Sequence, residues 1–402
     1  MNQRFYSLDV FRGATVCLMI LVNNPGTWDH IYAPLDHAEW HGLTPTDLVF
    51  PFFLFAVGNA LSFVMPRLQA GGDAVFWKKV ITRSLLIYFV GLFLTWWPFV
   101  ADVNRIVEGT TDLQRATIFK SWTWLDYSKD KAGNIIETLK GVRILGVLAR
   151  IAICYFFASV VIYYCKPRVA FYIGLVLLLL YWALCFLLGD YTMTGWFGND
   201  VDRAILNDPH IYHGERVNGL PYAFDPEGIM STMSAVVQVI FGYLVGDYIQ
   251  KKGKNFEMLT GLFVAGVAML VTGFCWDTVF PINKKIWTSS YTIYTSGLAT
   301  ITIATMIYLI EFKNHRGWLS KFFDVFGKNA LFVFALSAFL PKGLALIRFG
   351  HGVNPWNWLY KKVLIHIPGA PEIGSLVFAI CVITFMWFIC WWMDKKKIYV
   401  KV

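Results

Sequence analysis

The residues best suited to chemistry lie between the first two apolar segments of the sequence. His37 and His41 are four residues apart, and Asp47 follows at the start of the second apolar segment. A neutral imidazole, whose unperturbed pKa is about 6.5, can accept and return a proton near neutral pH. We therefore expect proton transfer here. Two histidines at this spacing also suit a metal on a helix, but Gly42 and Pro45 favour irregular backbone and no third ligand is convincing.

Asparagines and threonines extend this polar cluster. Asn23 and Asn24 end the first apolar segment, where hydrocarbon offers no hydrogen-bond partner, so we expect an aqueous cavity that faces outward beside them. Thr44 or Thr46 is expected to cap the next helix, with Asp47 complementing the helix dipole. That structural role is compatible with a catalytic one.

Other polar residues border later apolar segments. Arg150 lies one to two turns inside its segment and is expected to face an anion or a cavity, whereas Arg143 is interpreted as an interfacial anchor. The pair Asp225 and Glu227 is interpreted as a structural helix start. Lysines at the eighth segment either extend their charged ends to the interface or, with the residues after them, contact a phosphate or nucleotide. The residues of this group are Lys284, Lys285, Trp287, Ser289 and Ser290.

The composition identifies the elements that must position these residues. Of 402 residues, 57% are hydrophobic and only 15% are charged, against about 25% in soluble domains. We predict an all-α polytopic membrane protein with about ten transmembrane helices in one bundle, and a single integral domain over residues 1–402. The expected spans are 11–25, 47–65, 84–100, 143–164, 169–188, 229–249, 258–276, 289–311, 325–346 and 373–393.

The distribution of Lys and Arg predicts the orientation. Ten spans put both termini on one side, and the short breaks on that side are rich in Lys and Arg, which makes that side cytoplasmic. The ninth span is the weakest, because residues 322–326 also fit an interfacial helix. The net charge of +9 is spread among these breaks, so no nucleic-acid partner is expected. The cysteines predict neither disulfides nor a zinc site, and no cleavable signal peptide is expected.

Several of these motifs together resemble one known family. The segments 7–13 (SLDVFRG), 23–26 (NNPG), 37–44 (HAEWHGLT), 47–51 (DLVFP), 146–152 (GVLARIA), 225–228 (DPEG), 281–291 (PINKKIWTSSY) and 327–331 (GKNAL) resemble the heparan-α-glucosaminide N-acetyltransferase family. They follow one another over nearly the whole chain. The closer resemblance is to the shorter form typical of bacteria, which is expected to lack the extra lumenal domain of the lysosomal animal enzymes.

This resemblance implies a membrane-embedded acyltransferase in the bacterial inner membrane. Such an enzyme would use cytoplasmic acetyl-CoA, without a metal, to acetylate the amino group of a glucosamine-type sugar on the outer side, and family members are dimers. The histidine before Ala-x-Trp corresponds to His37, which would act as general base or carry an acetyl group, with Asp47 orienting it. Bacterial relatives are also described as possible amino-sugar transporters. The sugar contacts are then expected from Asn23, Asn24, Trp40 and His41, and the cofactor contacts from Arg150, Lys284, Lys285, Trp287, Ser289, Ser290 and Asn329.

The two substrates must meet inside the membrane. If CoA is cytoplasmic and His37 lies in an outward break, a pantetheine arm would have to extend through a tunnel across part of the hydrocarbon layer, which is about 30 Å thick. Lys284 and Lys285 fall on the outer side of the predicted topology, so they either serve the sugar or the eighth span is broken. The predicted positions of Arg150 and Asn329 are easier to reconcile with a nucleotide bound from the cytoplasmic side. A transporter would instead be expected to show repeat symmetry, and none is evident in the sequence.

Overall fold

Long apolar helices dominate the protein. The computed structural model describes residues 5–107, 112–129, 133–347 and 353–400. Within these ranges, nine helices are long and apolar enough to cross a membrane, and a tenth span exists if a bent pair counts as one. The predicted all-α polytopic architecture is confirmed. The nine are α1 (Tyr6–Asn23), α2 (Val49–Ala70), α3 (Gly72–Trp96), α4 (Val147–Tyr164), α5 (Pro167–Leu188), α7 (Ile229–Lys252), α8 (Phe256–Asp277), α9 (Ser289–Ile307, continued by a π-helical turn over Tyr308–Phe312) and α13 (Pro371–Lys395).

The predicted ninth span is not one straight helix. The structure replaces it with α10 (Trp318–Lys328) and α11 (Ala330–Leu344), which meet at 78°. The close crossing of α10 over α1 explains the bend: a Cβ atom on Gly13 would lie 1.7 Å from the Phe323 carbonyl oxygen, and one on Gly327 would lie 2.3 Å from that of Asp9. Small residues permit such backbone contact between membrane helices.

Helix α7 forms the centre of the bundle. Of the most apolar part of α7, 72% of the residues are buried, against 22% for α5 and 28% for α8. Glycines let α7 touch α2, since a Cβ atom on Gly58 would lie 1.9 Å from the Val239 carbonyl oxygen and one on Gly242 would lie 2.1 Å from that of Phe55. The outer faces of α5 and α8 carry exposed large apolar side chains, as expected for helices that face lipid.

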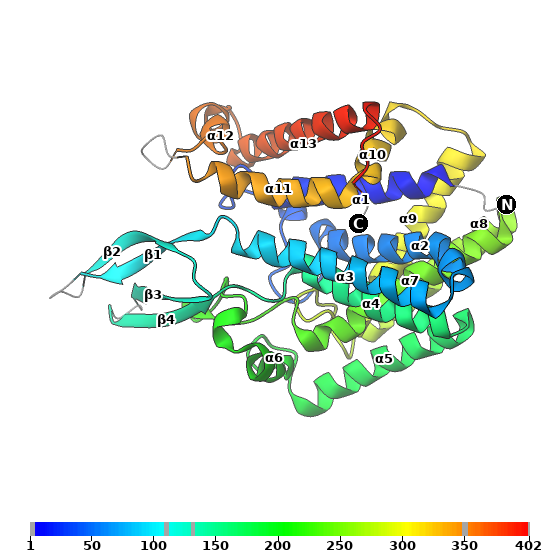
Figure 1. Cartoon of the computed structure of the whole chain (residues 1–402), viewed down its shortest axis with the longest axis horizontal. Coiled ribbons are helices and arrows are strands. Elements are labelled where there is room, and N and C mark those ends of the chain that lie inside the picture. Colours follow the sequence, from blue (N-terminus) through cyan, green and yellow to red (C-terminus); the bar gives the residue numbers. More distant parts are fainter. Residues whose placement is uncertain (1–4, 108–111, 130–132, 348–352, 401–402) are drawn as a thin grey trace.

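Two β-hairpins, which the sequence analysis did not predict, project from one end of the bundle (Figure 1). Strand β1 (Val100–Ile106) pairs with β2 (Leu113–Phe119), and β3 (Thr123–Lys129) pairs with β4 (Ile135–Gly141), both antiparallel. The backbone N–H of Asn104 donates to Asp126 Oδ1 at 2.9 Å and joins the two hairpins. We call this end the hairpin end.

Shorter elements complete the hairpin end and the loops. Helices α6 (Gly198–Leu206) and α12 (Trp358–Lys362) lie there too, and the N-terminus lies at the opposite end (Figure 1). The remaining elements are the small hairpin of β5 (Glu215–Val217) with β6 (Leu220–Tyr222), and 3-10 turns at Ala33–Leu35, Pro45–Leu48, Asp208–His210 and Leu364–His366.

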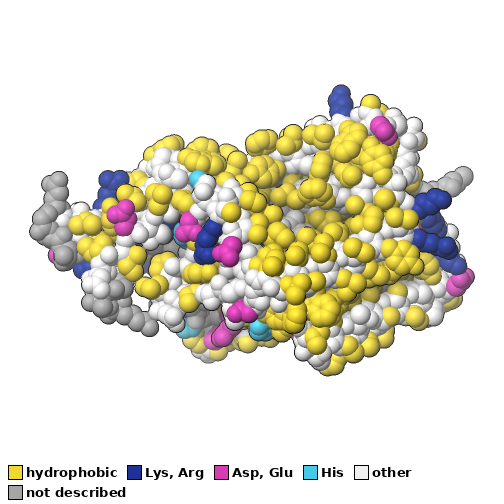
Figure 2. Space-filling model, turned by 90° about the horizontal axis from the view of Figure 1, so that it is seen from below, with side chains coloured by type: hydrophobic (Ala, Val, Ile, Leu, Met, Phe, Trp, Pro, Cys, Tyr) yellow, Lys and Arg dark blue, Asp and Glu magenta, His cyan; other side chains and the backbone are white. Residues whose placement is uncertain are grey.

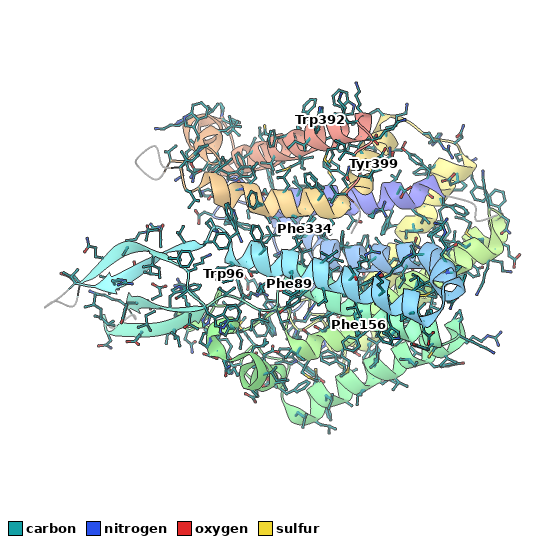
Figure 3. All side chains as sticks on the ribbon, viewed as in Figure 1. Phe89, Trp96, Phe156, Phe334, Trp392 and Tyr399 are labelled. Atoms are coloured by element: carbon teal, nitrogen blue, oxygen red, sulfur yellow. The ribbon has the colours of Figure 1, made fainter. Side chains whose placement is uncertain are left out.

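The surface agrees with a membrane location. Figure 2 shows a broad hydrophobic surface across the middle of the bundle, with charged side chains toward both ends and a group of Lys and Arg at the end opposite the hairpins. Among the side chains labelled in Figure 3, Trp96 lies beside the hairpins, and Trp392 and Tyr399 lie in the other half of the molecule. Such aromatic residues are enriched at membrane–water interfaces. The protein is therefore an integral membrane protein.

Candidate active site

The loop between α1 and α2 brings His37 to the hairpin end of the bundle. The 3-10 turn Pro45–Leu48 begins α2 with a capping box, in which Thr44 and Asp47 exchange side-chain and backbone hydrogen bonds. The predicted cap is thus confirmed. Gly42 has a φ of +106°, which suits glycine, and its N–H donates to the Ile282 carbonyl oxygen at 2.8 Å. This contact docks the loop onto the segment between α8 and α9.

That second segment carries Lys284 on a tight turn. Asn283 is fully buried, and its Oδ1 accepts the backbone N–H of Ile286 at 3.0 Å. The N–H of Asn283 donates to Thr288 Oγ1 at 3.0 Å, and Thr288 in turn caps α9. A side chain that hydrogen-bonds its own backbone in this way fixes a turn without regular secondary structure. The turn directs Lys284 toward the α1–α2 loop.

His37, Asp47 and Lys284 form one charged cluster. His37 Nδ1 lies 2.7 Å from Asp47 Oδ1, and Lys284 Nζ lies 2.9 Å from His37 Nδ1, 3.3 Å from His37 Nε2 and 3.4 Å from Asp47 Oδ1. Asp47 Oδ2 accepts the backbone N–H groups of Ala38 at 3.0 Å and Thr44 at 3.1 Å. The Asp47 side chain is 1% exposed, whereas that of His37 is 40% exposed. The imidazole is therefore positioned by a buried carboxylate on one side and is accessible to a substrate on the other.

Burial shifts the pKa values of two basic side chains near His37 toward the neutral form. Burial lowers the pKa of Lys284, although the nearby Asp47 carboxylate opposes this. Burial also lowers the pKa of His41, whose Nδ1 lies 3.4 Å from Asn283 Nδ2. In the described parts of the chain, no group of three or more His, Cys, Asp or Glu side chains is arranged to hold a metal ion.

A buried arginine lies deeper in the bundle than His37 and is linked to the cluster. The Tyr291 hydroxyl donates to the Asp47 carbonyl oxygen at 2.6 Å, and the Tyr291 ring lies 5.2 Å from that of Trp287. The Arg150 guanidinium lies 5.2 Å above the Trp287 ring and is fully buried. Its Nη2 donates to Gly228 O, but its Nε and Nη1, and the indole N–H of Trp287, find no partner among the described residues. Unpaired buried donors of this kind suit a polar ligand.

Asp225 and Glu227, which the sequence suggests as a helix start, are two further acidic residues near the site. Arg143 donates through Nε to Asp225 Oδ2 at 3.0 Å and through Nη2 to both Asp225 and Glu227. Burial would raise the pKa of Glu227, but the charges of Arg143, Arg150 and Lys284 together lower it. Glu227 is thus within electrostatic reach of Lys284. The DPEG motif at 225–228 marks this position in the sequence, but the motif alone does not show whether Glu227 belongs to a helix start or to the site.

The predicted sugar-contact residues are partly brought together. Trp40 donates its indole N–H to the Tyr191 carbonyl oxygen at 2.7 Å, and its ring lies 6.1 Å from that of His41. Asn23 is exposed at the end of α1, and the buried Asn24 donates its amide to the Ile20 carbonyl oxygen at 3.0 Å. The amide of Asn24 thus caps its own helix, and no hydrogen bond is found from either asparagine to the histidine cluster.

The predicted cofactor-contact residues separate into different places. Lys284 lies at His37, and Lys285 pairs with Glu215 at 2.9 Å. The hydroxyls of Ser289 and Ser290 are buried and donate to the carbonyl oxygens of Leu178 and Phe280. Asn329 lies at the break between α10 and α11, where its amide bonds the C-terminal residues Ile398 and Val400. Of the predicted set, Arg150, Trp287 and Lys284 are the ones linked to His37.

Sequence comparison relates the chain to two N-acetyltransferases. Human heparan-α-glucosaminide N-acetyltransferase is 25% identical over 386 residues, which cover 82% of this chain and 52% of the human protein. The chain is therefore similar in sequence to this N-acetyltransferase over most of its own length. The mouse heparan-α-glucosaminide N-acetyltransferase is likewise 25% identical over 383 residues, or 82% of this chain and 53% of the mouse protein.

The similarity to these N-acetyltransferases is broad but not complete. The chain spans about half the length of the curated relatives it matches. No family model matches the chain.

Proposed function

We propose that the chain is a membrane-embedded acetyltransferase that moves the acetyl group of acetyl-CoA to the amino group of a glucosamine-type sugar. The observation that carries this proposal is the His37–Asp47 pair, held at the hairpin end of a bundle that is homologous to N-acetyltransferases of a glucosaminide. In this proposal the whole chain acts as one integral acyltransferase domain. The relatives' names support the reaction type, and the cluster supplies the chemistry.

His37 is suited to act as the general base. An ionised carboxylate only accepts hydrogen bonds, so Asp47 fixes the imidazole proton on Nδ1 and leaves the Nε2 lone pair for the acceptor. His37 would take a proton from the sugar ammonium, because only the neutral amine attacks a thioester. Such a base typically accelerates a reaction about 10²–10⁴-fold. Lys284 balances the charge of the buried Asp47, which would otherwise be costly to ionise.

The acetyl carbonyl gains negative charge as the amine attacks and then needs hydrogen-bond donors. His41, whose ring lies 6.1 Å from that of Trp40, would supply one of them. Direct transfer and an acetyl-His37 intermediate both fit this arrangement. Rapid quenching in denaturant at neutral pH, followed by peptide mapping, distinguishes them, because only the second leaves label on His37.

Arg150 and Trp287 support a donor site on the inner side of His37. Arg150 has two buried nitrogens without a described partner, next to the equally unpartnered Trp287 N–H, and both are linked to Asp47 through Tyr291. We propose that they hold polar groups of acetyl-CoA, which would enter from the opposite end of the bundle. Asn329 lies farther along that course, but its amide is already bonded to the C-terminal residues.

We further propose that the hairpin end faces the outside of a bacterial inner membrane, with both termini cytoplasmic and the chain a homodimer. The group of Lys and Arg at the end opposite the hairpins (Figure 2) supports this orientation by the positive-inside rule. The homodimer follows from the family resemblance. Protease accessibility in sealed vesicles and mass measurement of the purified complex test these two proposals.

An amino-sugar transporter is the alternative from another class. Alternating access is commonly built from internal repeats that bear paired interrupted helices. Among the described helices, one sharply bent pair, α10 with α11, is long and apolar enough to form an interrupted span. The transporter is therefore not favoured by the observed architecture.

The decisive experiment measures acetyl transfer by purified protein from labelled acetyl-CoA to glucosamine. Wild type should form N-acetylglucosamine, and His37→Asn should not. His30→Asn is the matched control, since His30 is an exposed histidine of the same loop. Labelled sugar that crosses proteoliposomes without acetyl-CoA, with no acetylated product, would overturn the enzyme and support the transporter.

A further inference from the structure

Lys284 places a primary amine against the proposed base. Its Nζ lies 2.9 Å from Nδ1 and 3.3 Å from Nε2 of His37, within hydrogen-bond reach of the ring edge that would serve the acceptor. The acceptor of the proposed reaction is also a primary amine. A general base acts over heavy-atom distances of about 2.6–3.2 Å. The 3.3 Å between Nζ and Nε2 lies just beyond this range without any substrate, so a small side-chain movement brings the lysine within it.

The neighbouring lysine has a different environment. Lys285 Nζ lies 2.9 Å and 3.0 Å from the two carboxylate oxygens of Glu215, and 6.0 Å from the centre of the Trp40 ring. Both lysine side chains are 23% exposed, so access from solvent does not distinguish them. The two lysines differ in their distance from His37, because only Lys284 is in contact with it. Burial also lowers the pKa of Lys284, which increases the fraction of free amine.

We propose that Lys284 is a surrogate acceptor, which takes the acetyl group when acetyl-CoA is bound and no sugar is present. This inference rests on the proposed acetyl transfer. The thioester C–S bond breaks and an amide C–N bond forms to Nζ. The lysine ammonium loses two protons: one reaches the CoA thiolate and forms the thiol, and the other passes through His37 to solvent.

The modification would switch the site off. The amide carries no charge, so Asp47 would lose its cation, and the acetylated side chain would cover the ring edge that the sugar amine must reach. A bound sugar would protect the lysine by displacing it from His37. The acetylated state therefore reports a cell that has acetyl-CoA but lacks acceptor.

The test incubates purified full chain with acetyl-CoA, with and without glucosamine, and measures acetylation of a peptide that carries both lysines. Fragmentation in the mass spectrometer separates Lys284 from Lys285, which serves as the internal reference for non-enzymatic acetylation. We expect Lys284 to react on the order of 10²-fold faster than Lys285, the lower end of general-base catalysis. Glucosamine should suppress this, and His37→Asn should reduce the rate to that of Lys285.

A second measurement does not depend on the starting activity of a variant. Preincubation with acetyl-CoA alone should progressively inactivate wild type, whereas Lys284→Arg should keep whatever activity it begins with. If glucosamine is acetylated but both lysines react equally slowly, the surrogate acceptor is refuted while the proposed function stands. If neither glucosamine nor Lys284 is acetylated, the proposed function fails and this inference fails with it.

Discussion

Replacing Asp47 with Asn tests the role of the buried carboxylate. Oxygen Oδ1 accepts from His37 at 2.7 Å, and Oδ2 accepts the N–H of Ala38 at 3.0 Å and the N–H and hydroxyl of Thr44, each at 3.1 Å. An asparagine has one oxygen for these two sets of donors. If that oxygen keeps the backbone donors, its NH₂ group faces His37 and forces the imidazole proton from Nδ1 to Nε2, which removes the basic lone pair.

The size of the effect follows from these contacts. The variant loses one charge-assisted hydrogen bond, which contributes about 1.5–3 kcal/mol, and so should remain folded with a lower melting temperature. Loss of the general base should reduce acetyl transfer to glucosamine by about 10²–10⁴-fold, or about 2.7–5.5 kcal/mol in the activation free energy. Activity and thermal unfolding are measured on the same purified sample.

Asp36→Asn is the matched control in the same loop. Asp36 is exposed, and its Oδ1 accepts the backbone N–H of His37 at 2.7 Å, a hydrogen bond that an asparagine oxygen can also accept. Asp36→Asn should therefore change neither quantity much. A folded Asp47→Asn protein with more than about a tenth of wild-type activity would refute the orienting role, because even weak general-base catalysis exceeds that loss.

Three further changes test packing and charge. Gly58→Ala should destabilise the protein by about 1–3 kcal/mol in thermal unfolding, because the added Cβ would lie 1.9 Å from the Val239 carbonyl oxygen. Gly317→Ala is the control and should not destabilise it, since a Cβ there would have nothing within 4 Å. Equal melting temperatures of the two variants would contradict the close contact at Gly58. Burial raises the pKa of Asp202 to about 7. The folded carboxyl thus holds its proton to a higher pH than the unfolded one, so the free energy of unfolding should fall as pH rises from about 4 and level off above about 7. Asp202→Asn should flatten this pH dependence of the melting temperature, and an unchanged slope would show that another group causes it. Arg143→Lys should lose about 1.5–3 kcal/mol, because one ammonium cannot replace the forked contact to two carboxylates; a wild-type melting temperature would refute that contact.

The helices were largely predictable and the hairpins were not. Spans such as 229–249 and 373–393 correspond to helices whose long apolar sequences have no other stable form in lipid. The straight ninth span was not foreseen to bend so sharply, because its break at Asn329 depends on contact with α1, far away in sequence. The strands between 100 and 141 lie almost wholly in the gap between two expected spans, and their alternation is too short and too partly buried to predict strands.

The site was predictable where its residues are close in sequence. His37 and Asp47 share one loop, so local reasoning could pair them. The approach of Lys284 to that pair depends on the docking of Gly42 on Ile282, a contact between distant segments that no local pattern encodes. Asn24 shows another limit of local reasoning, because a polar side chain at the end of an apolar segment can bond its own helix, which the residue type alone does not reveal.

The separation of the cluster in sequence has a consequence for biosynthesis. Lys284 lies 247 residues after His37, so a growing chain presents the imidazole and carboxylate long before the ammonium is translated. Until α8 and the turn after it are inserted, the carboxylate of Asp47 has no Lys284 to neutralise it. Closure of this triad therefore waits for the turn after α8 to dock on the α1–α2 loop, and a chain stalled earlier in translation would carry the Asp47 carboxylate without this cation.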